Sequence, residues 1–346
     1  MNHPSNQPLV RTDVLPTLII GSGPAGLTAA IYLGRTKRHP VVISGNQLGG
    51  QLSVMAQIDN YPGFADGVAG YQLFSQMRAQ AEKFGAVILN ETVVAIDFSS
   101  QPHKIWTKDL VAAKEILDLP LGEMQQKIAE LKLLEPPTYQ AKTVIIATGA
   151  NRSRLNLPNE ESLIGRGISF CATCDAPFFN NKTVAVAGGG NAALEEALVL
   201  SKFAQKIYLL VRRQIFRADR HLQEQVLENP KIEVLWQTTI KEIKGSNRLE
   251  SLVVETHNSD SPVSQELAID GLFIAIGSQA NSSIFHQELE LAADGRLQVN
   301  SDTTLTNKAG IFAAGDIEQE LQQLVIAEAR GAQAAMAAET YLSELS

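Results

Sequence analysis

Two glycine-rich turns, each placed between a buried strand and a helix, constrain the fold of this chain more than any other feature. The first turn follows the apolar run 17–20, precedes helical periodicity over 27–34, and consists of Gly21, Ser22, Gly23, Pro24, Ala25 and Gly26. In this G-x-G-x-x-G spacing the first glycine permits a tight turn, the second lets a pyrophosphate approach the backbone, and the third allows close packing of helix on strand. Glycine turns alone are common, but the strand–turn–helix context predicts a dinucleotide site.

The same design returns in the middle of the chain. The apolar run 183–187 leads into Gly188, Gly189, Gly190, Asn191, Ala192 and Ala193, which have G-x-G-x-x-A spacing. Two such units in one chain are far more specific than either alone, and they imply two bound dinucleotides. The sequence therefore predicts an α/β protein with two Rossmann-like, three-layer dinucleotide-binding domains.

Basic residues follow the next strand of the second unit and bear on which nucleotide binds there. The run 206–211 ends in Arg212 and Arg213, and Arg217 follows shortly after. Cations at this strand end suit a ribose 2′-phosphate and favour NADP over NAD, whereas the alternative is a solvated basic turn. In the first unit the corresponding strand ends in Ser44 rather than in an acidic residue, so the ribose contact must be made otherwise.

The only two cysteines of the chain lie in the run Cys171, Ala172, Thr173, Cys174 and Asp175. Two intervening residues are few enough for a disulfide to close within one turn. At the mouth of a helix, free amide groups and the macrodipole favour thiolate, and Asp175 can carry protons as the disulfide opens and closes. The alternatives are half of a zinc site, or two buried cysteines that lie near each other by chance. Zinc needs four ligands, but the chain has no second Cys pair, and neither His221 nor any other histidine has a spacing that completes a site. The spacing predicts a redox pair.

Length and charge limit the classes of protein further. With 346 residues the chain allows two domains of ordinary size, and its formal net charge of −8 argues against a general affinity for nucleic acid or anionic membranes. No run reaches the roughly 18 apolar residues that a membrane span needs. Residues 1–15 are polar and are expected to form a disordered arm rather than a signal peptide. A cytoplasmic location is expected, and in a cytosolic chain a single CxxC is more plausibly catalytic than a structural cross-link.

Polar, glycine-rich segments near the first turn are candidates for contacts to a flavin. The runs 48–52 and 58–64 contain Gln51 and Asn60, whose amides can donate to and accept from a flavin ring edge. A plain loop is the alternative for both runs. Near the other end of the chain, Asp316 follows another buried run that closes in glycine, and it is placed to accept a hydrogen bond from a flavin ribityl hydroxyl.

Hydrophobic periodicity places the remaining elements. Segment 109–134 has helical periodicity and contains Pro120 and Gly122, so it is expected to form two short helices. Helices packed on the surface of a domain are one interpretation, and a partner-docking hairpin is the other. Further helices are predicted at 71–84 and 322–342, and further strands at 87–89, 93–96, 104–107, 143–149, 233–236, 252–255 and 271–277.

Taken together, these motifs resemble those of the low-molecular-weight NADPH-dependent thioredoxin reductase family, whose members are FAD-containing disulfide oxidoreductases. The resemblance runs from about Thr17 to Leu342 and is interrupted mainly between 108 and 138, where this chain looks longer. Its most specific part is the CxxC-Asp run shortly before the second glycine turn. The segments that add to it are 49–52, 60–63, Arg212 with Arg213, 216–218 and 311–316.

The resemblance implies a homodimer in which the second domain is inserted into the first. Residues 16–157 and 281–346 would form a discontinuous FAD-binding domain, and residues 158–280 an NADPH-binding domain that carries the cysteines. Because nicotinamide and cysteines would need the same flavin by turns, the family's domain rotation is expected, on hinges near 156–160 and 279–283.

The resemblance also implies a relay. Hydride would pass from NADPH to FAD and then to the disulfide, and the dithiol would reduce a thioredoxin-like protein by thiol exchange. By analogy Cys174 faces the flavin, Cys171 attacks the substrate and Asp175 is the general acid. The expected cofactor-binding residues are Gly21, Ser22, Gly23, Pro24, Ala25, Gly26, Gly50, Gln51, Leu52, Asn60, Val94, Ala147, Thr148, Gly149, Gly315, Asp316, Gln323, Leu324, Gly188, Gly190, Asn191, Ala192, Ala193, Glu196, Arg212, Arg213, Arg217, Ile276 and Gly277. No metal ligand is expected.

Several positions depart from the family's motifs. Val211 stands where the family usually has His before the paired arginines, and Ala176 stands where it has Gly. Gln322 replaces an arginine near the start of the C-terminal helix, and Glu328 and Arg330 replace small residues. Two alternatives stay open at this point: a flavin-linked disulfide reductase fed by ferredoxin or another flavin, and a FAD-binding redox sensor whose helical segment binds a partner.

Overall fold

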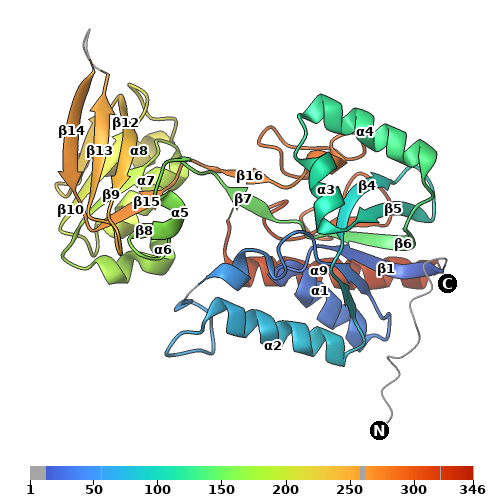
Figure 1. Ribbon diagram of the computed structural model, residues 1–346. Coiled ribbons are helices and arrows are strands. Elements are labelled where there is room, and N and C mark those ends of the chain that lie inside the picture. Colours follow the sequence, from blue (N-terminus) through green and yellow to red (C-terminus); the bar gives the residue numbers. More distant parts are fainter. Residues whose placement is uncertain (1–12, 56, 258–261, 320, 346) are drawn as a thin grey trace. The chain divides into compact units, whose positions relative to one another are not determined.

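The computed structural model describes residues 13–55, 57–257, 262–319 and 321–345 (Figure 1). The chain divides into two compact units, one made of residues 1–151 with 279–346 and the other of residues 152–278. These divisions lie a few residues before the two domain crossings expected from the sequence.

The first unit is built on a seven-stranded sheet with the order β3-β2-β1-β6-β5-β4, in which β17 also pairs with β6. Its strands are β1 (Val14–Ile20), β2 (Val41–Ile43), β3 (Val87–Leu89), β4 (Thr92–Asp97), β5 (His103–Lys108), β6 (Tyr139–Ile146) and β17 (Ile311–Ala313). Strands β1, β2, β3, β6 and β17 pair in parallel, whereas β5 is antiparallel to both β6 and β4. In register, Ile20 lies opposite Ile43 and Ile146, so the segments that follow these three residues meet at one edge of the sheet.

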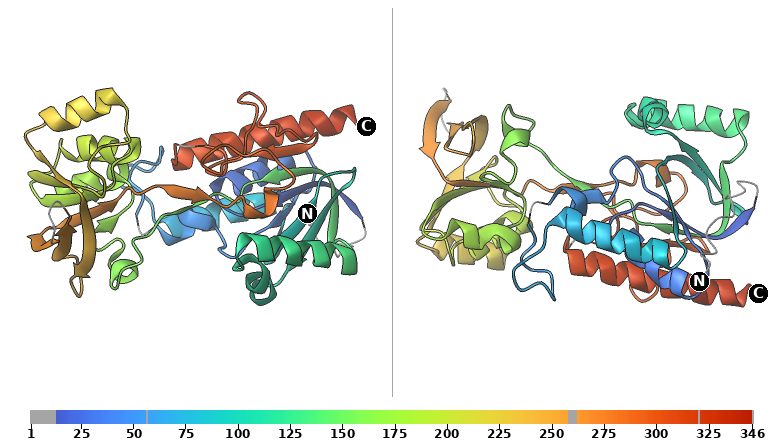
Figure 2. Two further views of the ribbon diagram at one scale, coloured as in Figure 1. Left: turned by 90° about the horizontal axis from the view of Figure 1, so that it is seen from above. Right: turned by 60° about the horizontal axis from the view of Figure 1, so that its bottom comes forward.

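Two hydrophobic cores sandwich this sheet. Helices α1 (Pro24–Arg35), α2 (Gly70–Lys83) and α9 (Leu324–Glu344) lie on one face (Figures 1 and 2). Ile19 of β1 belongs to the core under these helices, and its neighbour Leu18 belongs to the core on the other face, which Phe285 helps to close. Successive residues of a strand point to opposite faces, so a strand buried on both sides is apolar throughout.

The segment expected to be helical forms a hairpin of α3 (Leu110–Leu117) and α4 (Leu121–Leu134). Asp109 caps α3, because its Oδ1 accepts hydrogen bonds from the amides of Val111 and Ala112 at 2.9 and 3.0 Å. Ala113, Ile116, Met124 and Leu131 of the hairpin form a separate core cluster with β4 and β5. The two-helix prediction is therefore confirmed, and the helices pack on the sheet as surface helices do.

The second unit combines two sheets in separate layers. A parallel sheet has the order β11-β10-β9-β15-β8, and an antiparallel sheet has the order β12-β13-β14. The strands are β8 (Ile168–Ser169), β9 (Thr183–Ala187), β10 (Lys206–Val211), β11 (Ile232–Trp236), β12 (Thr238–Lys244), β13 (Ser251–Thr256), β14 (Val263–Ala268) and β15 (Gly271–Ile274). The helices are α5 (Glu160–Leu163), α6 (Ala172–Asp175), α7 (Asn191–Leu200), α8 (Arg220–Glu228) and the 3-10 turn η2 (Ala176–Phe179).

The core of the second unit follows the same alternation as the first. Val186 of β9 packs into a cluster with Leu194 of α7, and the adjacent Ala185 packs into a cluster with Leu252 of the antiparallel sheet. Helices therefore cover one face of the parallel sheet and the three-stranded sheet covers the other, as in a three-layer domain.

Two short strands form a small sheet where the chain passes between the units: β7 (Ala150–Arg152) and β16 (Ser278–Ala280). In the first unit the Oγ1 of Thr148 donates to the carbonyl of Asn281 at 3.0 Å, and the Nδ2 of Asn281 donates to the carbonyl of Thr148 at 2.9 Å. These bonds tie the outgoing and returning chain segments to each other.

Some sequence expectations need correction. The arm expected over residues 1–15 is too long, because Val14 and Leu15 already belong to β1 and pair with β6. Pro16 has no amide to contribute, but its carbonyl accepts a hydrogen bond from the Oγ1 of Thr143 at 3.0 Å, so the strand continues through it. The rest of the expected arm, residues 1–12, lies outside the described residues. The strands expected to run to Gly149 and Gly277 end earlier, at Ile146 and Ile274.

Candidate redox and dinucleotide sites

The first glycine turn has two positions where the fold requires glycine and one where it does not. A β-carbon on Gly21 would lie 2.2 Å from the carbonyl oxygen of Ala147, and Gly21 has a φ of +112°. A β-carbon on Gly26 would lie 2.0 Å from the carbonyl oxygen of Gly21. Gly23 has an ordinary φ of −69°, and a β-carbon there would meet nothing within 4 Å. Its open surface at the start of α1 fits the pyrophosphate of a dinucleotide.

Ser22 fastens this turn to two neighbouring segments. Its Oγ donates to the carbonyl of Ser44 at 3.2 Å, at the end of β2, and accepts from the amide of Gly49 at 3.0 Å. Gly49 leads into the 3-10 turn η1 (Gly50–Val54), where a β-carbon on Gly50 would lie 3.4 Å from the Cα of Gly23. Gly50, exposed Gln51 and buried Leu52 therefore follow directly beside the glycine turn.

One of the two loops expected to meet a flavin ring, 58–64, contacts the start of α9. The Nδ2 of Asn60 donates to the Oε1 of Gln323 at 3.3 Å, and Leu324 is the first residue of α9. One turn further on, the hydroxyl of Tyr61 donates to the Oε2 of Glu328 at 2.9 Å. Burial raises the pKa of both groups, that of Tyr61 to about 12. Two hydrogen bonds thus connect the loop 58–64 to the start of α9, although the two segments are far apart in sequence.

The other expected FAD residues of the first unit lie in different settings. Pro24 and Ala25 begin α1, Ala147 and Gly149 follow β6, and Gly315 lies so close to α1 that a β-carbon on it would be 2.9 Å from the Cβ of Ala25. Asp316 follows Gly315 after β17. Val94 lies at the register shift of β4, between the pairs made by Val93 and Ala95. Its side chain is buried under the α3–α4 hairpin, so only its backbone can face a ligand.

The second glycine turn repeats the geometry of the first. Gly188 has a φ of +150°, and a β-carbon on it would lie 2.3 Å from the carbonyl oxygen of Ala275. Gly190 has a φ of −101° and would meet nothing within 4 Å, just as Gly23 does. Ala192 is exposed at the start of α7, Ala193 is fully buried, and Ile276 and Gly277 follow Ala275 on the neighbouring strand end.

The loop that carries the three arginines is anchored to this turn. The amide of Arg217 donates to the carbonyl of Gly189 at 2.8 Å. Asn191 exchanges two hydrogen bonds with Asp219, from its Nδ2 to Oδ2 at 2.9 Å and to its Oδ1 from the Asp219 amide at 2.8 Å. Arg212, Arg213 and Arg217 are exposed, and none of them forms an ion pair with another described residue. The loop therefore presents cations beside the open glycine.

Cys171 and Cys174 form a disulfide, with their Cα atoms 5.3 Å apart. The pair brackets the start of α6, where the amide of Cys174 donates to the Sγ of Cys171 at 3.2 Å. Ser169, at the end of β8, holds the other side. Its Oγ donates to Asp175 Oδ2 at 2.6 Å and accepts from the amide of Cys171 at 3.1 Å. A redox pair and a carboxyl group that can hold a proton therefore share one hydrogen-bonded group.

Glu196 lies on the helix that packs against the CxxC segment, a position that the sequence motifs do not indicate. It lies on α7, which packs against α6, and the Ala172 amide between the two cysteines acts to lower the pKa of its carboxyl group. Its Oε2 is buried and has no hydrogen-bond partner among the described residues. Burial raises the pKa of Glu196 to about 7. The expectation from sequence places it with the dinucleotide, and the structure places it against the redox helix.

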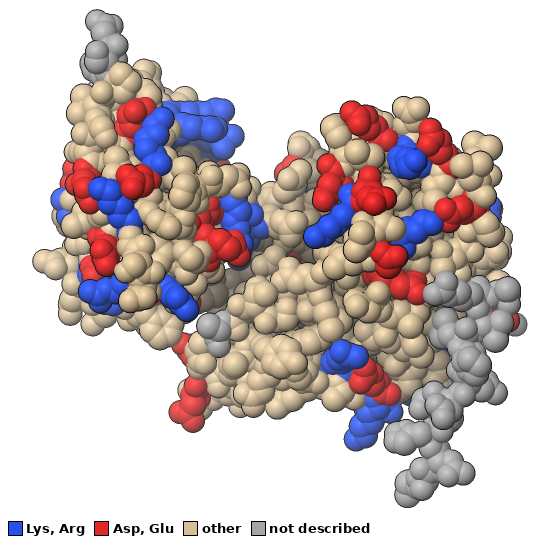
Figure 3. Space-filling model, in the orientation of Figure 1, with Lys and Arg blue, Asp and Glu red and all other residues tan. Residues whose placement is uncertain are grey.

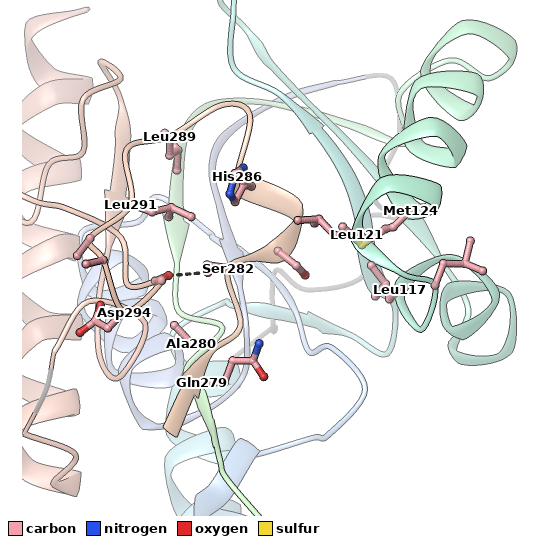
Figure 4. Close-up of a pocket in the computed structure, with 15 residues that line it drawn as sticks. Leu117, Leu121, Met124, Gln279, Ala280, Ser282, His286, Leu289, Leu291 and Asp294 are labelled. Atoms are coloured by element: carbon pink, nitrogen blue, oxygen red, sulfur yellow. Dashed lines mark hydrogen bonds between the residues drawn. The ribbon is translucent and has the colours of Figure 1, made fainter. Parts of the chain in front are cut away.

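A separate cavity of about 660 Å³ lies in the first unit, between the α3–α4 hairpin and the segment 279–295 (Figure 4). Leu117, Leu121 and Met124 of the hairpin face it, and the Oγ of Ser282 donates across its wall to the carbonyl of Gly295 at 2.6 Å. None of the expected cofactor-binding residues lines this cavity. It is distinct from the two glycine turns and from the cysteines.

Three further observations concern surface charge, membrane spans and metal sites. On the face shown in Figure 3, acidic and basic side chains are interspersed on both units, so this face carries no continuous field of one sign. Within the described ranges, no helix is long and apolar enough to cross a membrane. The same part of the chain holds no group of three or more His, Cys, Asp or Glu side chains that could bind a metal ion.

Comparison with known sequences gives a consistent result over nearly the whole chain. Residues 15–334 match the family model described as pyridine nucleotide-disulphide oxidoreductase. A thioredoxin reductase of Streptomyces coelicolor is 38% identical over 337 residues, which cover 97% of this chain and 96% of that protein. A thioredoxin reductase of Rickettsia bellii is 39% identical over 329 residues, which cover 94% of this chain and 98% of the relative.

Solved structures agree with the sequence relatives. Thioredoxin reductase from Giardia duodenalis matches with a TM-score of 0.82 at 32% identity, covering 95% of this chain and 98% of that one. The enzyme from Streptococcus pyogenes matches with a TM-score of 0.80 at 32% identity and the same coverage.

Proposed function

The chain belongs to the pyridine nucleotide-disulphide oxidoreductases and, among them, to the low-molecular-weight thioredoxin reductases. We propose that it passes hydride from NADPH to FAD, and that the reduced FAD then reduces the Cys171–Cys174 disulfide. Its function is that of a thioredoxin reductase. The observation that carries the proposal is the disulfide itself, which lies in the unit whose glycine turn is flanked by three exposed arginines. A nicotinamide donor and the electron acceptor are thus expected on one body.

The glycine turns fit the two dinucleotides. The amides at the start of α1, next to Gly23, would hold the FAD pyrophosphate, and Asp316 would accept from a ribityl hydroxyl. Gln51 and Asn60 would border the flavin ring. When bound, FAD supplies a two-electron carrier between the nicotinamide and the disulfide.

The second unit supplies the donor site. The α7 turn at Gly190 would hold the NADPH pyrophosphate, and Arg212 and Arg213 would pair with the 2′-phosphate through charge-assisted hydrogen bonds. Arg217, whose backbone is bonded to the same turn, would add a third positive charge. An NADH molecule lacks the phosphate that these side chains require, so NADPH is the expected donor.

The cysteines and Asp175 would carry out the thiol–disulfide exchange that reduces the substrate. Cys174 would take electrons from the flavin side, and Cys171 would attack the disulfide of a thioredoxin. Asp175, hydrogen-bonded by Ser169, would hold the proton that the leaving thiolate needs. Rotation of the second unit on the segments near 156–160 and 279–283 would let the donor and the cysteines reach the flavin by turns.

The proposal also includes a homodimer, which the resemblance implies, and a cytoplasmic location, in which a single CxxC pair is more plausibly catalytic than structural. The mass of the protein in solution, measured by light scattering after gel filtration, tests the dimer. A species of one chain at micromolar concentration would contradict it.

An anaerobic titration with NADPH tests the relay. NADPH should bleach the flavin absorbance of the purified protein, and full reduction should take about two equivalents, since flavin and disulfide each accept two electrons. The Cys174→Ser variant should take about one equivalent. If dithionite bleaches the flavin and NADPH does not, another donor such as ferredoxin replaces NADPH and the proposal is overturned.

A further inference from the structure

Glu196 holds a carboxyl group directly under the CxxC segment. The helix α7 that carries it packs against α6, and the amide of Ala172, the residue after Cys171, acts to lower the pKa of its carboxyl group. Ala172 lies between Cys171 and Cys174 in the sequence, so the amide that acts on this carboxyl group belongs to the CxxC segment itself. Its Oε2 is shielded from solvent and has no hydrogen-bond partner among the described residues.

A carboxylate with one buried oxygen left unsatisfied is unfavourable when it is ionised. Burial is the main reason that the pKa of Glu196 rises to about 7, with Asp175 of α6 and Glu195 of α7 adding to the rise. Arg152 of β7 and the Ala172 amide act in the opposite direction. These are the charged groups that face it, and together they leave it changing charge near neutral pH.

We propose that Glu196 is a positioning residue for the redox pair, and that its charge state controls how much of the reduced Cys171–Cys174 pair is present as thiolate. The inference rests on the proposed function only in assuming that these cysteines are the redox pair. It concerns the charge next to the sulfur atoms and does not require contact between Glu196 and a nucleotide.

The electron and proton balance of disulfide reduction shows why the charge of Glu196 affects the amount of thiolate. Breaking the sulfur–sulfur bond takes two electrons and one proton to leave one thiol and one thiolate, and a second proton completes the dithiol. A negative charge on Glu196 repels the thiolate and favours the thiol, whereas a protonated Glu196 does not. The two groups therefore titrate together, and a thiolate in turn favours the protonated form of Glu196.

Alkylation of the chemically reduced protein tests the inference without turnover. The full-length chain is reduced with dithiothreitol, and the rates at which iodoacetamide modifies Cys171 and Cys174 are followed by peptide mass spectrometry as a function of pH. In the wild type, the rate of the more reactive cysteine should show an inflection at about pH 7 besides its own thiol titration, from ionisation of Glu196. In Glu196→Gln this inflection should disappear, and the rate at about pH 8 should rise roughly tenfold.

Glu195→Gln is the matched control, because it removes the same charge from the neighbouring, exposed position of the same helix. It should keep the wild-type inflection, moved only slightly to lower pH, because Glu195 is one of the smaller causes of the raised Glu196 pKa. A Glu196→Gln profile that superimposes on the wild type would overturn the inference, as would an equal change in Glu195→Gln. If Glu196→Gln does not fold, the wild type still decides, since a profile with a single inflection contradicts the inference. None of these results alters the NADPH titration, so the proposed function is tested separately.

Discussion

The carbonyl oxygen of Gly21 lies where a β-carbon on Gly26 would have to go, at a separation of only 2.0 Å. This contact lets α1 start directly over the end of β1, and any larger residue at position 26 would push the helix off the strand. Gly23, between them, has neither a close neighbour nor an unusual backbone angle. Packing explains the outer glycines, whereas a ligand bound against the turn would explain the middle one.

Gly23→Val and Gly190→Val should therefore separate binding from folding. Each variant should fold with a free energy of unfolding within about 1 kcal/mol of the wild-type apoprotein, because a β-carbon there would meet no protein atom within 4 Å. Gly23→Val should purify without flavin, and Gly190→Val should keep flavin but bind NADPH at least about tenfold more weakly. Flavin content by absorbance and NADPH affinity by calorimetry are the measurements. Normal flavin content in Gly23→Val would show that the first turn does not hold it.

Gly331 of α9 is a second test of close packing. A β-carbon on it would lie 2.1 Å from the carbonyl oxygen of Ala25 in α1, so Gly331→Ala should destabilise the protein by about 1–3 kcal/mol. Gly122→Ala is the control, since Gly122 lies exposed in α4 with nothing within 4 Å and the change should stabilise by about 0.5–1 kcal/mol. Denaturant unfolding measures both. Equal effects of the two changes would contradict the packing account.

Strands with continuous apolar runs could be predicted from the sequence because both faces of a parallel sheet are buried. The strand β12 could not, since it carries Lys241 and Glu242 on an outer layer and alternates little. The strand β14 also could not be predicted, because Ser264, Gln265 and Glu266 are all exposed and give no apolar pattern. Of the antiparallel layer only β13, with its apolar run Leu252, Val253 and Val254, is predicted from the sequence, and the other two strands depend on pairing that single-chain periodicity does not contain.

Motifs with fixed local spacing also made much of the candidate site predictable. The two glycine turns and the CxxC depend on residues a few positions apart, and so their geometry is largely local. Glu196 under Ala172 and Tyr61 against Glu328 join residues that are distant in sequence. Nothing in a linear pattern indicates which helix residue will face another element once the layers pack.

Nucleotide choice should depend on the paired arginines. Removing one charge-assisted phosphate contact costs about 1.5–3 kcal/mol, so Arg212→Ala with Arg213→Ala should raise the KM for NADPH at least about tenfold and leave that for NADH nearly unchanged. Steady-state kinetics with both nucleotides measure this. Arg220→Ala is the control, because Arg220 is exposed nearby but forms an ion pair with Glu224. Equal losses with NADPH and NADH would show that the arginines do not bind the phosphate.

Glu196 should also make stability depend on pH. Its pKa is raised from 4.5 to about 7 in the folded protein, so the folded state binds the proton more tightly than the unfolded state. Its contribution to the free energy of unfolding should fall by roughly 3 kcal/mol as pH rises from about 4.5 to about 7, and it should stay low above that. Glu196→Gln should therefore stabilise the protein more at pH 8 than at pH 5, as measured by urea unfolding. A difference that does not vary with pH would contradict this assignment.

The central claim is that electrons leave this protein through one disulfide. Steady-state reduction of a bacterial thioredoxin by NADPH should be robust in the wild type and should vanish in Cys174→Ser. The variant should still oxidise NADPH with ferricyanide, which takes electrons directly from a flavin. Thioredoxin reduction that persists in Cys174→Ser, or that is missing from a flavin-loaded wild type, would contradict the account.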